Sequence, residues 1–508
     1  MTTASSKLST PYPVPPLSDK EREFVAQINA TWTQQIAHSK LRSTLQAAVE
    51  VELATIPIYL YTYYSIQRTV GDSAKPPVFP HTALARFADK AGAFIMSVAV
   101  EEMLHMSLSS NILFALGQMP VLFGKSPTFP ANLPGHSPHG PSGGRAAIDL
   151  APLSEAHLRQ FLLIEYPAPA DAEPEGAGWD TIGQIYSYIR CIISSQWISD
   201  SDFHGNRKYQ IQSGNYSPNS IDTIYPDAAF DKVTPVPAGQ PGSASKVAQY
   251  ASREDSHVGG KQLLQISSRK EALQAIATID FEGEGFGPTK FDDPSHGEYS
   301  HYWKFLTVQS HLAGYSKTGP DIAPLPLPPE PVVPAVTANE LHSVVFNFPI
   351  NPTTTVPVPP HNIGYTDRFD RDIVDLSSAL YTYMLIMTET LFKVPDPQQK
   401  LFFNQTLHMS MIWLLDKYCQ GMRTITMNSA ATPSTDPDGK MRLAPSFQNF
   451  PFSSRALAHG EMASLGMAIE IKYAKDPRYS AIGWLVTMIS GNATTPPVLP
   501  DVAKYWMP

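Results

Sequence analysis

Two cysteines in 508 residues are too few to stabilise a fold by several disulfide bonds. Cys191 and Cys419 lie far apart and form no Cys-x-x-Cys pair. A disulfide framework and a thiolate zinc site are therefore excluded, and the low count is typical of a reducing cytosol. Basic residues are also in deficit, with 37 lysines and arginines against 46 acidic residues and a formal net charge of -9. The chain has no basic footprint for nucleic acid and no polybasic block for a membrane surface.

Long hydrophobic runs are missing as well. No stretch approaches the roughly 18 consecutive apolar residues of a membrane-spanning helix, and the N-terminal segment MTTASSKLSTPYPVPPLSDK has no apolar core of signal-peptide type. We therefore expect a soluble, cytoplasmic protein. Its expected partners are a small-molecule substrate or other protein chains, with no nucleic acid and no membrane, and a homodimer is left open.

Prolines are abundant and mark the loops. The chain has 48 of them, about twice the average usage, and they cluster between segments of helical pattern. The Pro-rich stretches are residues 75–80, 125–144, 167–178, 216–242 and 319–360. A hydrophobic content of 43% is enough for a substantial core between these loops.

The stretch VAVEEMLHMSLSSNILFALG, residues 98–117, is the most informative part of the chain. It belongs to a predicted helix over residues 81–116, which Gly117 should end. An apolar seam with the helical repeat of about 3.6 residues runs along it from Phe87 to Leu116 and carries Glu102 and His105 in its middle. A buried, unpaired carboxylate is costly, and a metal ion is a common partner when Glu and His share a helix face at i, i+3.

The Glu-x-x-His spacing occurs three times. With Glu at roughly 5% of residues, the 15 histidines should give about one such pair by chance. The three pairs are Glu102/His105, Glu254/His257 and Glu298/His301. The middle pair lies in ASREDSHVGG, which is polar on all sides and favours an exposed surface. The other two pairs lie in apolar, helix-forming sequence, which favours metal ligands.

An earlier helical pattern spans roughly residues 19–68, with a break expected near His38. Its second part places Glu52 on the apolar seam, whereas Glu50 points to the opposite, solvated side. Pro57 removes a helical hydrogen bond and should kink or end the helix one turn past Glu52. A kink beside a buried carboxylate would open room for a ligand.

The following segments are shorter. SEAHLRQFLLIEYPAP predicts a short element that ends at Glu165, and TIGQIYSYIRCIISSQW predicts a helix with no acidic residue at all. Residues 200–265 are polar and predict long loops with a hairpin at HGNRKYQIQSGN. A further helix brings Glu282 and Glu284 to its Gly-rich end, and EYSHYWKF then places Glu298 and His301 on one apolar seam.

The second half also contains acids and histidines, but without clear spacing on a seam. They are Glu389, His408, His459 and Glu461. A second metal site there is the weaker interpretation, and we expect this half to act as scaffold or dimer surface. The pair His136 and His139 in a Gly/Pro loop is likewise expected to be exposed rather than metal-bound.

Several motifs resemble, in order, those of one enzyme family. They are AVEVELATIPIYLYTYYSI, AVEEMLHMSLSSNILFALGQMP, TIGQIYSYI, the FEGEG turn and EYSHYWKF. Together they resemble the ferritin-like domain of the iminophenylpyruvate dimer synthase and chromopyrrolate synthase family, which serves violacein- and rebeccamycin-type pathways, and of its stand-alone relatives. The resemblance covers roughly residues 41–312.

The resemblance implies a mainly α fold: a ferritin-like four-helix bundle with long loop insertions and a second helical region. We expect an N-terminal arm and helix at residues 1–38 and the metal-binding bundle with its inserted loops at residues 39–318. A Pro-rich extended linker should follow at residues 319–362, and a C-terminal helical region packed on the bundle at residues 363–508.

The resemblance also implies an iron-type centre. The residues that correspond to its ligands are Glu52, Glu102, His105, Glu298 and His301. The family usually shows Gln-Gly-Glu-Gly where this chain has Glu-Gly-Glu-Gly at residues 282–285, so the sixth ligand is left open between Glu284, Glu282 and Glu165. The expected cofactor is iron, two ions per chain, with manganese as the other metal that this donor set suits.

The leading functional hypothesis is a non-haem di-iron oxidase or oxygenase that uses dioxygen on a small aromatic or amino-acid-derived substrate in specialised metabolism. Tyr59, Tyr63 and Tyr302 are candidates for its substrate pocket, although aromatic residues at helical spacing are more often core. One alternative is an imine or enamine dimer-forming synthase of the bisindole type. Others are a metal-free scaffold protein of a biosynthetic complex, in which the acids form a hydrogen-bonded core, and a ferroxidase, against which the large loops argue.

Overall fold

The computed structural model describes the following residues: 13–68, 83–136, 147–169, 171–212, 263–284, 300–312, 336–354, 364–403, 410, 414–428 and 440–507. Over these residues the fold is mainly α, and extended segments pair only as isolated β-bridges. This confirms the fold class predicted from the sequence.

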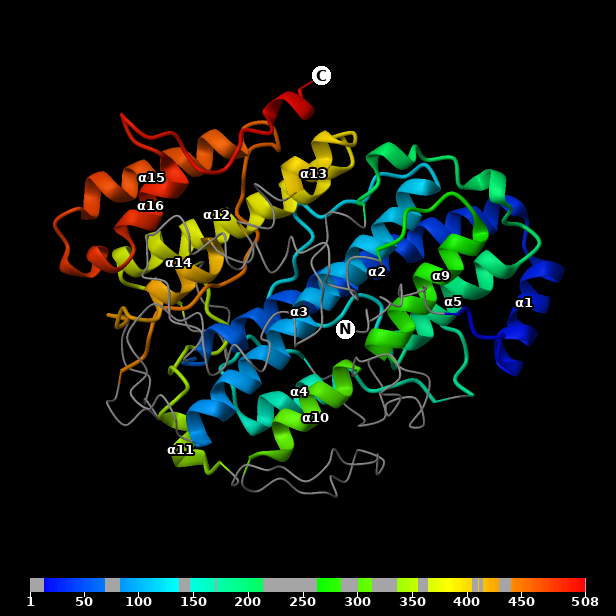
Figure 1. Ribbon diagram of the computed structural model, residues 1–508, viewed down its shortest axis with the longest axis horizontal. Coiled ribbons are helices and arrows are strands. Elements are labelled where there is room, and N and C mark those ends of the chain that lie inside the picture. The colour runs from blue at the N-terminus through cyan, green and yellow to red at the C-terminus, as the bar shows by residue number, and fades with distance from the viewer. Residues whose placement is uncertain are drawn as a thin grey trace, which may run out of the picture.

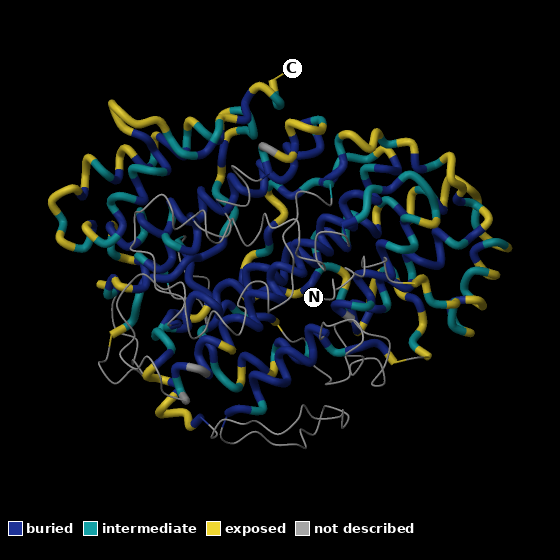
Figure 2. Tube along the Cα trace, viewed as in Figure 1, coloured by how far each residue is buried: buried dark blue, intermediate teal, exposed yellow. Residues whose placement is uncertain are grey.

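Two long helices form the centre of the molecule. They are α2 (Gln34–Ser65) and α3 (Ala83–Ala115), which run side by side through the middle of Figure 1. Both are buried along most of their length, and Figure 2 shows the same region as the dark core of the trace. An α-helix buried on all sides needs apolar residues all round, which is the composition of both helices.

Shorter helices cover this central pair. Near one end α5 (Ile182–Ser194) packs on α2, and α9 (Arg269–Ile279) packs on α3. Nearer the other end α10 (His301–Ser310) packs on α3 and on α4 (Glu155–Ile164). The third and fourth positions of the four-helix bundle are thus each divided into two helices. Asp280–Glu284 continues α9 as a π-helix, and α1 (Asp19–Thr31) packs on α5.

Helix boundaries follow capping residues in the sequence. Gly117, with φ of +80°, ends α3, because only glycine adopts this left-handed conformation at little cost. Ser154 caps α4 by accepting the backbone N–H of His157, and Ser268 caps α9 by accepting that of Glu271. The predicted ends of the central helices are confirmed to within a few residues.

Three local predictions are wrong. The first helical pattern breaks at Trp32 rather than near His38, because Thr33 accepts the backbone N–H of Ile36 and starts α2 there. Pro57 does not end α2, which continues for two more turns inside the core, so the predicted helix end is wrong and the alternative, a kink, stays a prediction. The described part of the expected hairpin, residues 204–212, forms bends and a 3-10 helix, Arg207–Tyr209, instead of strands.

The C-terminal region adds further helices to one side of the bundle (Figure 1). They are α11 (Ala338–His342), α12 (Arg368–Leu391), α13 (Gln398–Phe402), α14 (Leu415–Met422), α15 (Ala458–Tyr473) and α16 (Gly483–Ser490), with 3-10 turns at Pro477–Ala481 and Ala503–Tyr505. A further 3-10 turn, Asp200–Asp202, follows α5 in the first half of the chain. Helix α14 contacts α2. Just after α14, the fully buried Arg423 donates hydrogen bonds to the backbone oxygens of Tyr64 and Ile66, at 3.0 and 2.9 Å. The predicted domain boundaries, including the linker at 319–362, stay predictions.

One helical stretch of the described residues, Phe87–Ala115 within α3, is long and apolar enough to cross a membrane by length and composition alone. Its most apolar window is wholly buried among the other helices. Core helices pass the same test, so this is weak evidence for a membrane span, and the cytoplasmic location stays a prediction.

Candidate metal centre

Three side chains from two helices converge at one interior point. Glu102 and His105 come from α3, and His301 begins α10. Each offers a ligand atom, and these atoms all lie within 4.8 Å of one another. All three residues are buried. The i, i+3 spacing on α3 places its two side chains on the same face, toward the first turn of α10.

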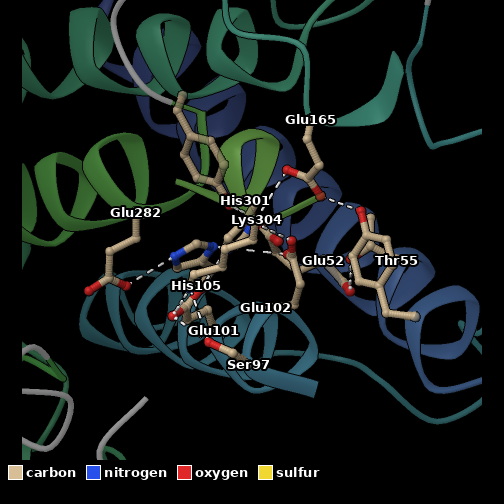
Figure 3. A network of polar contacts seen from close by, with 12 residues as sticks. Glu52, Thr55, Ser97, Glu101, Glu102, His105, Glu165, Glu282, His301 and Lys304 are labelled. Carbon is tan, nitrogen blue, oxygen red and sulfur yellow. Dashed lines mark hydrogen bonds and ion pairs between the residues drawn. The ribbon is translucent and has the colours of Figure 1, made fainter. Parts of the chain in front are cut away.

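His301 lies among three carboxylates (Figure 3). Its Nδ1 atom is 3.0 Å from Glu102 Oε1 and 3.2 Å from Glu165 Oε2. Its Nε2 atom is 3.0 Å from Glu101 Oε2. Glu165 is the C-cap residue of α4, so a third helix contributes to the centre.

His105 packs against His301, with ring centroids 5.2 Å apart and an angle of 24° between the rings. Its Nδ1 atom is 3.9 Å from Glu102 Oε2, and its Nε2 atom is 3.3 Å from Glu282 Oε2. Glu282 belongs to the π-helix that follows α9. In the same turn, a Cβ atom added to Gly283 would lie 3.1 Å from His105 Cε1 and 3.7 Å from His301 Cε1. Glycine thus lets this backbone approach both rings.

Two tyrosines hold carboxylates of the centre. The Tyr186 hydroxyl donates a hydrogen bond to Glu52, and the Tyr59 hydroxyl donates one to Glu165. A further hydrogen bond joins the carboxyl groups of Glu52 and Glu102. Helix α5, which has no acidic residue, therefore contributes a phenol where the other helices contribute acids.

Behind His301 lies a buried ion pair. Lys304 Nζ, one turn along α10, is 2.5 Å from both carboxylate oxygens of Glu101 and 3.0 Å from Ser97 Oγ. Lys304, Glu101 and Ser97 are all buried. Sequence reasoning missed this group, although Glu101 is four residues before His105 and Lys304 three residues after His301. These spacings are the signal that places both side chains near the histidines.

The two imidazoles differ in pKa. Burial lowers the pKa of His105 to about 3, although the Glu102 carboxylate opposes the shift. Burial also acts to lower the pKa of His301, but the carboxylates of Glu165 and Glu102 outweigh it and raise that pKa well above its ordinary value. The His301 position therefore favours a positive charge.

The acids respond to the same neighbours. Burial acts to raise the pKa of Glu102, yet the hydrogen bond from Glu52 and the imidazole of His301 lower it to about 2. For Glu101, burial is likewise opposed by Lys304, which lowers the pKa of the carboxyl group. For Glu165 burial prevails and raises the pKa. The partners of each buried carboxyl group therefore decide the direction in which its pKa shifts.

The structure brings together most, but not all, of the residues proposed from the sequence. Glu52, Glu102, Glu165, Glu282, His105 and His301 meet at the centre. Glu298 lies outside the described residues, as do Glu254, His257, His139 and His408. Glu284 ends the π-helix, but its side chain is likewise outside the description. His136 packs edge-on against Trp179, away from any acid among its described contacts.

The candidate pocket tyrosines are core residues. Tyr59, Tyr63 and Tyr302 are exposed by 0, 3 and 1%, so none of them lines an open cavity in this structure. Tyr59 packs edge-on against Phe161 and reaches the centre through its hydroxyl. Tyr63 instead lies under the guanidinium of Arg68. Their role in a substrate pocket stays a prediction.

The acids and histidines described in the C-terminal half have separate partners. Glu389 pairs with Arg455, His459 Nε2 lies 2.9 Å from the backbone oxygen of Leu499, and Glu461 accepts the backbone N–H of Ser453. Among the described residues of this half they form no second cluster, and the scaffold interpretation stays a prediction.

Comparison with known proteins identifies the family. The ferritin-like family profile matches residues 45–310, more than half of the chain and all of the helices that build the centre. The chain belongs to the ferritin-like family. The resemblance inferred from the motifs is thereby confirmed, together with the ferritin-like fold.

The chain is similar to two known proteins. The 2-imino-3-(indol-3-yl)propanoate dimerase of Chromobacterium violaceum is 24% identical over 312 residues, which are 59% of this chain and 25% of that protein. The match therefore spans about a quarter of the length of this relative. A crystal structure of a ferritin-like protein from Caulobacter vibrioides covers 75% of this chain and 94% of its own at 18% identity, with a TM-score of 0.40. That score is too low to support any argument.

The residues present fit a metal centre of the ferritin-like type. The donors are carboxylate oxygens and imidazole nitrogens without thiolate, a set that suits iron or manganese better than zinc. Five buried carboxyl groups surround the centre, against one lysine, Lys304, and a bound cation would balance the negative charge of those that are ionised. The close approach of Gly283 to both rings forms one wall of the site.

Proposed function

We propose that this chain is a metal-dependent enzyme, a non-haem di-iron oxidase or oxygenase that acts with dioxygen on a small aromatic or amino-acid-derived substrate. The observation that supports it most is the convergence of Glu102, His105 and His301 in the core. Without a cation, such a cluster of acids and imidazoles would be a costly interior.

In this proposal Glu52, Glu102, Glu165, His105 and His301 hold the metal, with Glu298 and Glu284 as further ligands expected from the sequence. A pair of iron ions, or iron with manganese, held by these residues would supply the redox chemistry that dioxygen activation needs.

The protein's own contribution is orientation and the exclusion of water. Glu102 lies between the two imidazoles, with one carboxylate oxygen near each ring, so it would hold metal together with both histidines. Tyr186 and Tyr59 fix the rotamers of Glu52 and Glu165 through their hydroxyl groups. All these side chains are buried, and a low local dielectric strengthens each charge interaction among them.

A second candidate function is the coupling of two imines or enamines. It is favoured by the similarity to the Chromobacterium violaceum protein, which is a 2-imino-3-(indol-3-yl)propanoate dimerase. Since the match spans only a quarter of that protein, the reaction is a proposal for this chain. A metal-free scaffold role is a third candidate, and the two enzyme candidates are separated from it by metal uptake.

An oxygen-electrode experiment tests the leading proposal. Iron-loaded protein should consume dioxygen when an aromatic amino acid or its imine is supplied, and mass spectrometry should find an oxidised monomer. His105→Ala should consume none, because a ligand is lost, whereas the control His257→Ala should behave like the wild type. A coupled dimer as product would favour the second candidate. Dioxygen uptake that depends on free Fe(II) alone, without substrate, would instead indicate a ferroxidase and contradict the proposal.

A further inference from the structure

The two imidazoles of the centre have the same arrangement of neighbours, with Glu102 on the Nδ1 side and another carboxylate on the Nε2 side. His301 has Glu102 at its Nδ1 atom and Glu101 at its Nε2 atom, each at 3.0 Å. His105 has Glu102 on its Nδ1 side at 3.9 Å and Glu282 at its Nε2 atom at 3.3 Å. Each ring therefore has the shared Glu102 along one edge and a carboxylate of its own along the other.

We propose that Glu101 and Glu282 are positioning residues that hold the Nε2 atoms of His301 and His105. A neutral imidazole has one N–H group, and the carboxylate that accepts it decides which nitrogen keeps its lone pair. His105 Nε2 is hydrogen-bonded to Glu282, whereas His301 Nε2 faces Glu101 at 3.0 Å as a charge contact without hydrogen-bond geometry. Held in this way, both rings would turn Nδ1 toward the Glu102 side. The inference rests on the proposed function, because it assigns roles around the same centre. It also divides the acids of the centre into two groups: Glu101 and Glu282 position the histidines, and Glu52, Glu102 and Glu165 are metal ligands.

Lys304 explains why Glu101 would hold a ring rather than bind the metal. Its ammonium group contacts both oxygens of Glu101 at 2.5 Å, and Ser97 lies 3.0 Å from the same nitrogen. Because Lys304 is one turn after His301 on α10, the helix that presents the imidazole also carries the counter-ion of the carboxylate behind it. The ion pair is buried, so separating Lys304 from Glu101 would leave an unpaired charge in the core at a high energetic cost.

Glu282 reaches His105 through a feature of the backbone. The π-helix Asp280–Glu284 follows α9 and brings Gly283 against the Cε1 edges of both rings. Glu282 precedes that glycine, and its Oε2 atom lies beside His105 Nε2 rather than beside Nδ1. Single-turn π-helices are frequent at functional sites, where they redirect a side chain. The turn therefore fixes the edge from which His105 is held.

Co(II) titration of metal-free protein tests this assignment, with visible absorption as the readout of ligand geometry. Glu101→Gln and Glu282→Gln should each bind the wild-type number of Co(II) ions, but with affinity lowered by about 10- to 100-fold, as expected for partners of ligating histidines. Their ligand-field bands should shift, because the imidazoles lose their fixed orientation. Glu102→Ala, which removes a ligand, should instead lower the number of ions bound.

A matched control is available in the same bundle. Glu21 forms a buried ion pair with Arg190 at 3.3 Å, between α1 and α5, and none of its described contacts involves a residue of the centre. Glu21→Gln should lower stability while leaving Co(II) affinity and spectrum unchanged. If Glu101→Gln folds poorly, Glu101→Gln/Lys304→Met removes both charges, leaves no unpaired ion, and should show the same weakened binding.

The outcomes separate the two proposals. If the wild type takes up no Co(II), the proposed function is contradicted. If the wild type binds Co(II) and the Glu101 and Glu282 variants bind it with the same affinity and spectrum, the positioning inference alone is overturned. A reduced number of ions in Glu282→Gln would show that Glu282 is a ligand, which also overturns its assignment.

Discussion

Adjacent glutamates on α3 have different neighbours. Glu101 contacts Lys304 and the Nε2 atom of His301, whereas Glu102 contacts the Nδ1 side of both imidazoles. Residues one apart on a helix are about 100° apart around its axis, so each can meet a different partner. At this scale, the identity of a side chain matters less than the ring edge or charge that it faces.

His157 gives a prediction about stability away from the centre. Burial lowers its pKa to about 4, and its Nε2 atom has no hydrogen-bond partner among the described residues. The unfolded chain, with a histidine pKa of about 6.5, binds a proton first as the pH falls. The stability contributed by neutral His157 is therefore complete above about pH 6.5 and is lost between that pH and about pH 4, by roughly 3 kcal/mol.

Urea unfolding of the wild type and His157→Gln at pH 7 and pH 4.5 measures this effect. The wild type should lose more of its free energy of unfolding than the variant over this interval, because only the wild type has the buried imidazole. Equal losses in the two proteins would show that His157 does not titrate as its burial indicates.

The residues found from sequence were those with two independent signals. Glu102 and His105 combine a seam position with the i, i+3 spacing, and Glu52 lies on a long seam of its own. Glu101 and Lys304 have only their helical spacing to a histidine as a signal, and a charged residue beside a seam is ordinarily solvated. Only the packing of α10 against α3 shows that both are buried. Sequence therefore predicts ligands better than the residues that hold them.

At the scale of elements, the π-helix Asp280–Glu284 decides one wall of the centre. The sequence marks the FEGEG segment as a Gly-rich helix end, but an i→i+5 turn is not predictable from it. Such a turn depends on what packs against it, here the edges of His105 and His301. The break at Trp32 and the continuation past Pro57 were missed for a similar reason, since tertiary packing overrides local preference.

Gly283→Ala tests the importance of this contact. The added Cβ would lie 3.1 Å from His105 Cε1, which is tighter than ordinary packing. Overpacking of this kind costs about 1–3 kcal/mol, and denaturant unfolding of the metal-free protein should show such a loss. Gly460→Ala is the matched control, because its Cβ would meet nothing within 4 Å on the exposed side of α15. It should stabilise the protein by about 1 kcal/mol through helix propensity. If Gly283→Ala were also stabilising, the close approach would be disproved.

At the scale of the whole molecule, the C-terminal region is anchored to the bundle at more than one place. Besides Arg423, Glu389 of α12 accepts the backbone N–H groups of Leu122 and Phe123, at 2.6 and 2.8 Å, and pairs with Arg455. These contacts fix the segment that follows α3. The sequence indicated helices in this half but not these anchors, which depend on buried polar contacts between distant residues. The homodimer suggested from the sequence stays a prediction.

The central claim is that this ferritin-like bundle holds metal at the point where its acids and imidazoles meet. Elemental analysis of purified protein after anaerobic reconstitution with Fe(II) and removal of free metal measures this directly. We expect about two metal ions per chain, iron or iron with manganese, as for other carboxylate-bridged bundles, and a marked loss of metal in His105→Ala with its helical content retained. Less than about 0.2 ions per chain in the wild type would contradict the account, since metal ligands that are already assembled in the folded protein should bind metal when it is supplied.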